Sequence, residues 1–258
     1  MKSLTITFLA AALLSTLTPS LAQTFTDCNP LERDDCPHMP ALGQRNITFD
    51  FNTTFNDRLW NVTSTEKGIN WSPRGTAFTI ERSGHSPTLK SNFYIFFGRA
   101  SIIMKAAKGK GIVSSFIMQS EDLDEIDWEF LGGKPNEVMT NYFGKGNTTN
   151  FARGQEFESV DVTEGFHNYT LDWTRERIEW WMDDKLLRTL KYEEALGGQE
   201  YPQTPMTIRM GSWSGGDKEN NDPGVVVCGF SDWPTSFTAL DSFEEREREK
   251  ERELTRIF

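Results

Sequence analysis

Residues 166–190 read FHNYTLDWTRERIEWWMDDKLLRTL, and this stretch decides the fold. Apolar residues alternate with polar ones from Tyr169 to Trp173 and again from Ile178 to Met182. Such a period of two is typical of β-strands that bury one face. Asp183-Asp184 supplies a tight turn before the chain continues at Leu186. The stretch therefore predicts antiparallel strands joined by short connections.

The same pattern extends in both directions along the chain. Between Asn46 and Leu240, short apolar runs are separated by Gly, Pro, Asn and Asp, with almost no helical period. Residues 92–107 predict another long strand with alternating faces, and the turn Gly109-Lys110-Gly111 leads into a further apolar strand over 112–118. We therefore expect an all-β sandwich.

Aromatic side chains are abundant, with eight Trp and nineteen Phe. We expect most of them to pack between two sheets, while a few present a flat face on which a sugar ring stacks. Trp60 and Trp71 fall in early predicted strands. Trp181 and Trp213 interrupt polar or glycine-rich surroundings and are the better candidates for sugar platforms.

The two ends of the chain differ from the middle. Residues 1–22 combine Lys2, an apolar run and small residues before Ala22, which predicts a cleaved signal peptide and secretion. A membrane anchor needs about 20 continuous apolar residues, and this run is shorter. Residues 23–240 are expected to form one folded domain. The charged tail 241–258 has no apolar face and is expected to be helical or disordered, with no membrane span.

Several features fit an extracellular protein. Six Asn-x-Ser/Thr sequons predict N-glycosylation at Asn46, Asn52, Asn61, Asn70, Asn147 and Asn168. Among the three cysteines, Cys28 and Cys36 are expected to form a disulfide, which leaves Cys228 unpaired. No Cys/His cluster has the spacing of a metal site, so no metal is expected.

The formal net charge is -11, which argues against a nucleic-acid partner because no basic surface would neutralise phosphates. An uncharged polymer remains a suitable partner.

Segment 124–130 reads DEIDWEF and carries the chemistry. In a strand, Glu125, Asp127 and Glu129 share one face while the apolar residues between them enter the core. Three acids on one face repel each other and raise one another's pKa, which is costly as a structural choice. A glycosidase needs such a set, because it uses one ionised and one protonated carboxyl group at the same pH.

The three carboxyl groups are expected to have different roles. Glu125 is the expected nucleophile, Glu129 the acid and then the base, and Asp127 the residue that tunes both pKa values. Residues four apart on a strand have Cα atoms about 13 Å apart, whereas a retaining pair of carboxyl groups lies about 5 to 5.5 Å apart. The side chains must therefore lean together on a curved sheet. A solvated acidic strand or a calcium site is the alternative interpretation.

The segment resembles the E-x-D-x-E strand of glycoside hydrolase family 16, a β-jelly-roll of two curved antiparallel sheets. Five surrounding segments are similar to fungal Crh cell-wall transglycosylases, as is an N-terminal CNPL followed by a second Cys: SNFYIFFGR (91–99), KGIVSSFIMQS (110–120), LDEIDWEFLGG (123–133), TNYFGKGNTT (140–149) and QTPMTIRMGSWSGGD (203–217). The likeness runs from about Cys28 to Asp217.

The resemblance implies a retaining enzyme without a cofactor that cleaves chitin and transfers the fragment to β-glucan, cross-linking the cell wall. By position, Gln119 and Tyr142 would border the groove beside Glu129. Arg209 and Trp213 would hold sugar units, Trp213 by stacking. We expect a monomer.

The likeness ends after Asp217. Val225 stands where the family has a sugar-contacting Thr, and Cys228 stands where it has a Trp. After Phe237-Thr238 the closing strands of the jelly roll are expected to be missing, through divergence or a mistaken exon end, which would leave a sheet edge unpaired. The family's membrane anchor and chitin-binding module are also not found in this sequence.

Two other functions fit part of the pattern. A β-1,3/1,4-glucan endohydrolase would use the same catalytic strand, because transfer and hydrolysis share the first half-reaction. A non-catalytic carbohydrate-binding jelly roll would fit a site damaged by the altered C-terminal region, but the intact acid triad favours an enzyme.

Overall fold

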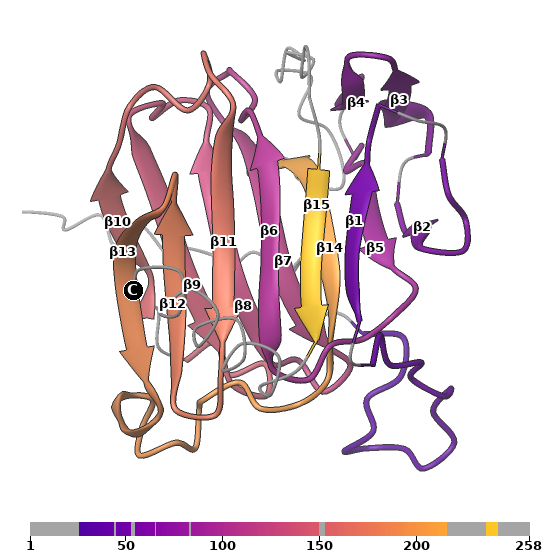
Figure 1. Ribbon diagram of the computed structural model, residues 1–258, viewed down its shortest axis with the longest axis vertical. Helices are drawn as coiled ribbons and strands as arrows, with labels where there is room; N and C mark the ends of the chain where they lie inside the picture. Colours follow the sequence, from indigo (N-terminus) through magenta and orange to yellow (C-terminus); the bar gives the residue numbers. More distant parts are fainter. Residues whose placement is uncertain are drawn as a thin grey trace, which may run out of the picture.

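The strands form two antiparallel sheets that lie face to face, with a short hairpin beside them (Figure 1). The structure is a computed structural model that describes residues 26–43, 45–52, 55–64, 66–82, 84–149, 153–215 and 236–241. Its strands are β1 (Asn46–Asp50), β2 (Trp60–Val62), β3 (Ile69–Ser72), β4 (Gly75–Phe78), β5 (Thr88–Ser91), β6 (Gly98–Met104), β7 (Ile112–Ser120), β8 (Glu125–Leu131), β9 (Glu137–Phe143), β10 (Gln155–Glu158), β11 (His167–Trp173), β12 (Arg177–Met182), β13 (Lys185–Lys191), β14 (Met206–Ser214) and β15 (Ser236–Asp241).

The strand order defines the two layers. One sheet has six strands in the order β1-β15-β6-β11-β12-β13, and the other has seven in the order β10-β9-β8-β7-β14-β5-β2. Neighbours within each sheet run antiparallel. The expected all-β jelly-roll sandwich is confirmed.

The hairpins β11–β12–β13 follow the sequence closely. Tyr169, Leu171 and Trp173 are fully buried, as the alternation predicts. The turn between β12 and β13 falls on Asp183 and Asp184, whose φ angles are 48° and 65°. Tight hairpin turns of this kind need positive φ at both central residues, and Asp tolerates that region better than most residues.

The long strand expected over 92–107 is shorter than predicted. Strand β6 begins only at Gly98, because Phe97 has a φ of 57°, outside the extended region. Residues before it make only isolated bridges, including one between Ile95 and Met206. The alternation of burial is nevertheless correct, since Phe93, Ile95 and Phe97 are buried and Phe96 is exposed.

Large aromatic side chains fill the space between the sheets. Trp128 of β8 lies with its ring centroid 5.5 Å from that of Tyr169 of β11, across the two layers. Trp180 and Trp173 are fully buried, and their indole N–H groups donate to backbone carbonyls at 2.9 Å. Because these polar atoms are satisfied, each ring contributes its full apolar burial, and truncating such a Trp to Ala typically costs about 3–5 kcal/mol.

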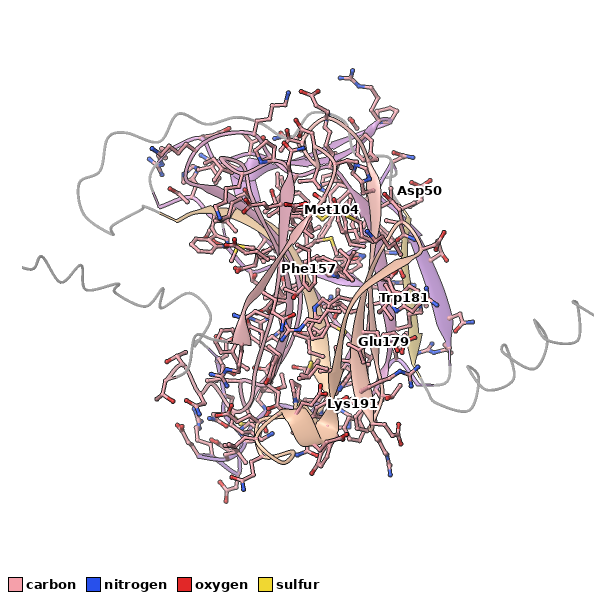
Figure 2. The ribbon with its side chains drawn as sticks, turned by 90° about the vertical axis from the view of Figure 1, so that its left-hand side faces the viewer. Asp50, Met104, Phe157, Glu179, Trp181 and Lys191 are labelled. Atoms are coloured by element: carbon pink, nitrogen blue, oxygen red, sulfur yellow. A yellow bond between two sulfur atoms is a disulfide. The ribbon has the colours of Figure 1, made fainter. Side chains whose placement is uncertain are left out.

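Trp181 lies outside this core. It belongs to β12 of the six-stranded sheet, and its indole N–H donates to Glu179 on the same strand at 3.2 Å (Figure 2). Its position on the six-stranded sheet separates it from the acid strand, which lies in the seven-stranded sheet.

The predicted disulfide between Cys28 and Cys36 is confirmed, with the two Cα atoms 5.5 Å apart. Cys228 and Val225 lie outside the described residues, as do the predicted signal peptide and residues 242–258 of the tail. Within the described ranges, no helix combines the length and apolar character needed to cross a membrane.

The sequons differ in accessibility. Asn46, Asn61 and Asn70 are exposed, whereas Asn52, Asn147 and Asn168 are half-buried. The side-chain amide of Asn147, to which a glycan would be attached, donates a hydrogen bond to Glu200. Glycosylation stays a prediction, and the first three sites fit it best.

The expectation of missing closing strands needs a correction. Strand β15 lies between β1 and β6 and is antiparallel to both, so this part of the six-stranded sheet is continuous. The region after Asp217 departs from the family pattern in side chains, but backbone pairing in a sheet does not require particular side chains. The edge that the sequence led us to expect here is therefore paired.

Deleting residues 236–258 should destabilise the protein, whereas deleting only 242–258 should not. The longer deletion removes β15 and leaves β1 and β6 without their shared partner. We expect the longer deletion to lower the melting temperature by about 4–8 °C, equivalent to about 2 kcal/mol. Equal melting temperatures of the two truncated proteins would contradict this role of β15.

Candidate active site

The acid strand β8 lies in the middle of the seven-stranded sheet, between β7 and β9. Ile126, Trp128 and Phe130 are fully buried in the core. The intervening residues Glu125, Asp127 and Glu129 therefore point to the opposite, outer face of the sheet. The structure confirms the shared face that the alternation predicted.

Strand register brings further polar side chains to the acids. Glu125 lies opposite Gln119 of β7, and the Gln119 side-chain amide donates a hydrogen bond to the Glu125 carboxylate. One row further along β8, Asp127 lies opposite Ile117, which in turn lies opposite Arg209 of β14. Residues in register share a face, so Gln119 and Arg209 join the acids although they are distant from them in sequence.

A groove of about 360 Å³ lies on this face of the sheet, and Glu129 is the one of the three acids that lines it. Four predicted site residues line it: Gln119, Glu129, Arg209 and Trp213. Trp213 is in register with Val113 of β7, on the side of the sheet that carries Arg209. Its partly exposed ring is therefore available to the groove, as a sugar platform requires.

Tyr142 does not border the groove, which corrects the expectation taken from the family resemblance. It lies opposite the buried Ile126, so its side chain points to the core face of the sheet. There its ring centroid lies 5.5 Å from the guanidinium carbon of Arg188. The neighbouring Asn141 and Phe143 instead share the face of Asp127 and Glu125.

Burial governs the protonation of the acids. Removal from water raises the pKa of Glu125, while the neighbouring Asp127 and the hydrogen bond from Gln119 oppose that rise. The pKa of Asp127 is raised much further, first by burial and then by the charge of Glu125. Of the two neighbouring carboxyl groups, Asp127 therefore keeps a proton more readily and Glu125 is the more readily ionised.

Glu129 has the properties of an acid catalyst. Burial, followed by repulsion from Glu125, raises its pKa to about 7. At mildly acidic pH it is therefore protonated while it faces the groove. The nearby Arg209 favours the ionised form of Glu125, although burial lowers the pKa of Arg209 itself. The pKa of Glu125 is also raised to about 7, but because the charge of Glu125 raises the pKa of Glu129, Glu125 ionises first, which is the order that glycoside cleavage by two carboxyl groups needs.

The core side of β8 holds the strand in place. The Trp180 indole N–H donates to the backbone carbonyl of Asp127 at 2.9 Å. The buried guanidinium of Arg188 lies 4.6 Å from the Trp180 ring centroid and donates to the side chain and carbonyl of Thr140 on β9. Its positive charge also opposes the rise in the pKa of Asp127.

A buried polar network fixes the start of β8. Asp124 accepts hydrogen bonds from the Lys145 ammonium at 2.9 Å and from the Thr204 hydroxyl at 2.7 Å. Asp122 contacts the same Lys145 ammonium at 2.7 Å. Two other loops thus converge on the residue before Glu125, which limits the movement of Glu125.

Part of the groove wall was not predicted from the sequence. Thr26, Asp27, Thr88, Lys90 and Ser115 also line the cavity. Ser115 lies opposite Glu129, and its position on the groove face follows from the alternation of β7. Thr26 and Asp27 come from the segment before the disulfide, and nothing in their local sequence indicates that they reach the groove.

The described residues contain no group of three or more His, Cys, Asp or Glu side chains arranged to hold a metal ion. The arrangement fits proton transfer and nucleophilic attack by carboxyl groups on a neutral ligand. The groove offers hydrogen-bonding side chains and one indole ring, which are the groups that recognise sugars.

Comparison with known proteins agrees with this geometry. A Crh-like protein of Arthroderma benhamiae is 56% identical over 210 residues, which cover 81% of this chain and 56% of the relative. The chain thus spans a little over half the length of that relative. A solved structure of Crh5 transglycosylase in complex with NAG is 40% identical, covers 84% of this chain and 91% of its own, and has a TM-score of 0.74.

A Bacillus licheniformis β-glucanase shares the fold, with a TM-score of 0.63 at 22% identity, over 77% of this chain and 98% of its own. The family profile of the glycosyl hydrolases of family 16 matches residues 54–231, which include β8 and the groove strands. The acid strand and the two-sheet fold agree with the sequence match, and the chain belongs to glycosyl hydrolase family 16.

Proposed function

We propose that this protein is a retaining transglycosylase that cleaves chitin and passes the fragment to β-glucan in the cell wall. The observation that carries the proposal is the row of Glu125, Asp127 and Glu129 on the groove face of one strand. The similarity to Crh-like proteins and to a transglycosylase crystallised with NAG supports the choice of substrate, because NAG is the repeating unit of chitin.

The proposed reaction is a double displacement. The Glu125 carboxylate attacks the anomeric carbon while Glu129 gives its proton to the glycosidic oxygen of the leaving chain, and a covalent glycosyl ester forms. Glu129, now ionised, takes the proton of an acceptor hydroxyl that attacks the same carbon and releases Glu125. Asp127, which holds its own proton, and Gln119 orient Glu125 through the first step.

The remaining site residues bind rather than react. Arg209 and Trp213 hold sugar units along the groove, with the Trp213 ring stacked on a sugar face. No resident cofactor takes part in this sequence of steps. We further propose that the chain is secreted to the cell wall, that it acts there as a monomer, and that its exposed sequons carry glycans.

The decisive experiment incubates the protein with fluorescent chito-oligosaccharide as donor and unlabelled β-glucan as acceptor. We expect labelled products that both a chitinase and a β-glucanase shorten, because a hybrid contains both linkages. Label found only in shorter chito-oligosaccharides would identify a hydrolase. Binding of both sugars without any product would identify a carbohydrate-binding protein.

Replacing either catalytic glutamate should abolish turnover without unfolding the protein. Glu125→Gln and Glu129→Gln keep the shape of the side chain but remove the nucleophile or the acid, so we expect kcat to fall about 10³-fold or more. Asp127→Asn should cost less, about 10- to 100-fold, because it tunes Glu125 without attacking the substrate. Glu176→Gln, exposed in the turn between β11 and β12 of the six-stranded sheet, serves as the control, and melting curves check the fold. Activity above a few per cent in either glutamate variant would refute the assignment.

The pH profile should report the raised pKa of Glu129. Because the acid must be protonated, kcat/KM should fall about tenfold for each pH unit above its pKa of about 7. Glu129→Ala assayed on an aryl chito-oligosaccharide, whose leaving group needs no proton, should lose this alkaline limb. Persistence of the limb in that variant would assign it to another group.

A further inference from the structure

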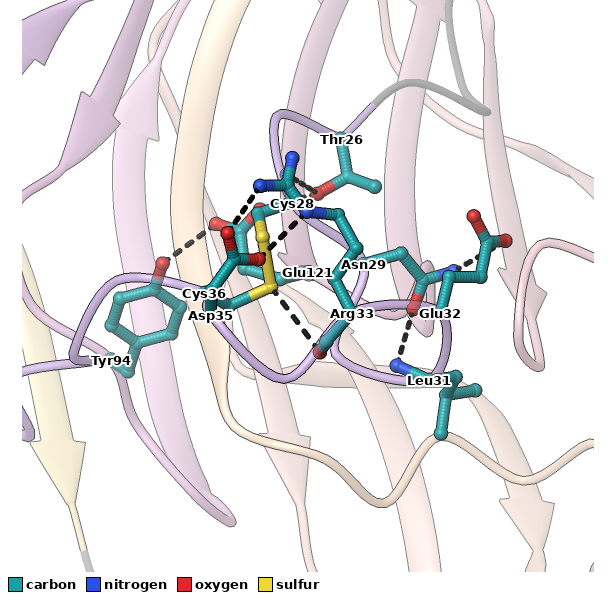
Figure 3. The surroundings of a disulfide bond; sticks show 10 residues. All are labelled: Thr26, Cys28, Asn29, Leu31, Glu32, Arg33, Asp35, Cys36, Tyr94 and Glu121. Atoms are coloured by element: carbon teal, nitrogen blue, oxygen red, sulfur yellow. Dashed lines mark hydrogen bonds and ion pairs between the residues drawn. A yellow bond between two sulfur atoms is a disulfide. The ribbon is translucent and has the colours of Figure 1, made fainter.

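The disulfide loop is tied to the groove sheet through Glu121. This residue follows β7 directly and accepts hydrogen bonds from the Thr26 hydroxyl at 2.5 Å and the Tyr94 hydroxyl at 2.6 Å (Figure 3). It also accepts one from the Lys90 ammonium at 2.7 Å. Thr26 lies two residues before Cys28. One carboxylate therefore joins the loop, the strand β5 and the segment before β6.

The negative charge of Glu121 is favourable here because two positively charged side chains lie close to it. Lys90 lies directly opposite Arg209 in the β5–β14 pair, and two cations in register repel each other. Glu121 forms an ion pair with Lys90 and also acts electrostatically on Arg209. Although burial opposes it, hydrogen bonds led by that from Lys90 lower the pKa of Glu121 to about 2, so it stays ionised.

The loop forms a wall of the groove, and among residues 26–43 only Cys28 and Leu42 are buried. Thr26 and Asp27 line the groove together with Lys90, Gln119 and Arg209. Behind them, a second cavity of about 430 Å³ separates the loop from the sheet, and the disulfide, Met39, Tyr94 and Glu121 line it. The wall is thus supported by discrete contacts rather than by close packing.

Those contacts lie at the two ends of the loop. The far end is held by backbone hydrogen bonds of 2.8 Å between Leu42 and Tyr94 and between Tyr94 and Pro40. At the near end the Thr26 hydroxyl bonds Glu121, and the Cys28–Cys36 disulfide shortens the chain between the two ends. Loss of either near-end constraint frees the segment that carries Asp27.

We propose that the Thr26–Glu121 hydrogen bond and the Cys28–Cys36 disulfide together hold Asp27 and its segment as a sugar-binding wall on the β5 side of the groove. Thr26 and Glu121 are positioning residues in this arrangement, and Asp27 contacts a sugar unit bound beyond Arg209. The proposal rests on the proposed function for the nature of the ligand. Glu125 and Glu129 lie outside the wall, so it affects binding of longer chains rather than the chemical step.

The test compares Thr26→Val, which has the same shape but lacks the hydroxyl, with Thr26→Ser, which restores it. We expect Thr26→Val to raise KM for a long chito-oligosaccharide about fivefold, the effect of losing one ordinary hydrogen bond, with kcat changed less than about twofold. Thr26→Ser should return KM to the wild-type value. Thr189→Val, on the exposed face of β13, is the matched control.

Two further measurements separate the wall from a general loss of stability. Cys28→Ser/Cys36→Ser should raise KM similarly, and adding Thr26→Val to it should have little further effect, since both changes free the same segment. Amide hydrogen exchange without sugar should show lost protection in residues 26–36 of Thr26→Val and not elsewhere. Additive effects on KM, or unchanged exchange, would overturn the proposal.

The exchange measurement also distinguishes a failure of the proposed function from a failure of the proposed sugar-binding wall. If the wild-type protein neither binds nor converts chito-oligosaccharides, the proposed function fails, while local loss of protection in Thr26→Val still supports the tether. If the wild-type protein turns over the sugar and Thr26→Val has the same KM, the proposed function stands and the sugar-binding wall is wrong.

Discussion

The repulsion among three carboxyl groups on one face of β8 is the constraint on which the rest of the site depends. Three neighbouring negative charges that are largely removed from water are unfavourable, so some of the carboxyl groups must stay protonated. The structure resolves this by burial, which raises all three pKa values, and by placing Gln119 and Arg209 where they favour the ionised form of Glu125. The distribution of protons that results is the one that a double displacement needs.

Holding that arrangement requires rigidity on both sides of the strand. On the core side, Trp180 bonds the carbonyl of Asp127, and Arg188 lies against the Trp180 ring while it bonds β9. At the start of β8, Asp124 accepts hydrogen bonds from Lys145 and Thr204, which lie in two other loops. These buried polar groups are expensive to dehydrate, and their hydrogen bonds offset that cost only in one geometry, which is how they specify the position of Glu125.

Alternation within a strand was readable from the sequence, and pairing between strands was not. The period of two placed Glu125, Asp127 and Glu129 on one face and identified β11 to β13 correctly. Tyr142 was placed beside the groove by the family resemblance alone, and only its pairing with Ile126 shows that its side chain lies on the core face. Strand β15 was missed for a related reason, since its partners β1 and β6 are far away in sequence and its backbone pairs with them irrespective of the family's motif.

Two glutamates close to the groove differ in protonation because their surroundings differ. Glu121 and Glu129 are both glutamates beside β7, yet the pKa of the first falls to about 2 and that of the second rises to about 7. Lys90, Thr26 and Tyr94 all donate to Glu121, whereas Glu129 faces the negative charge of Glu125. The first is thereby fixed as a permanent anion that can only organise its surroundings. The second keeps a proton near neutral pH and can give it to a substrate, so the division between structure and chemistry is set by the neighbours of each carboxyl group.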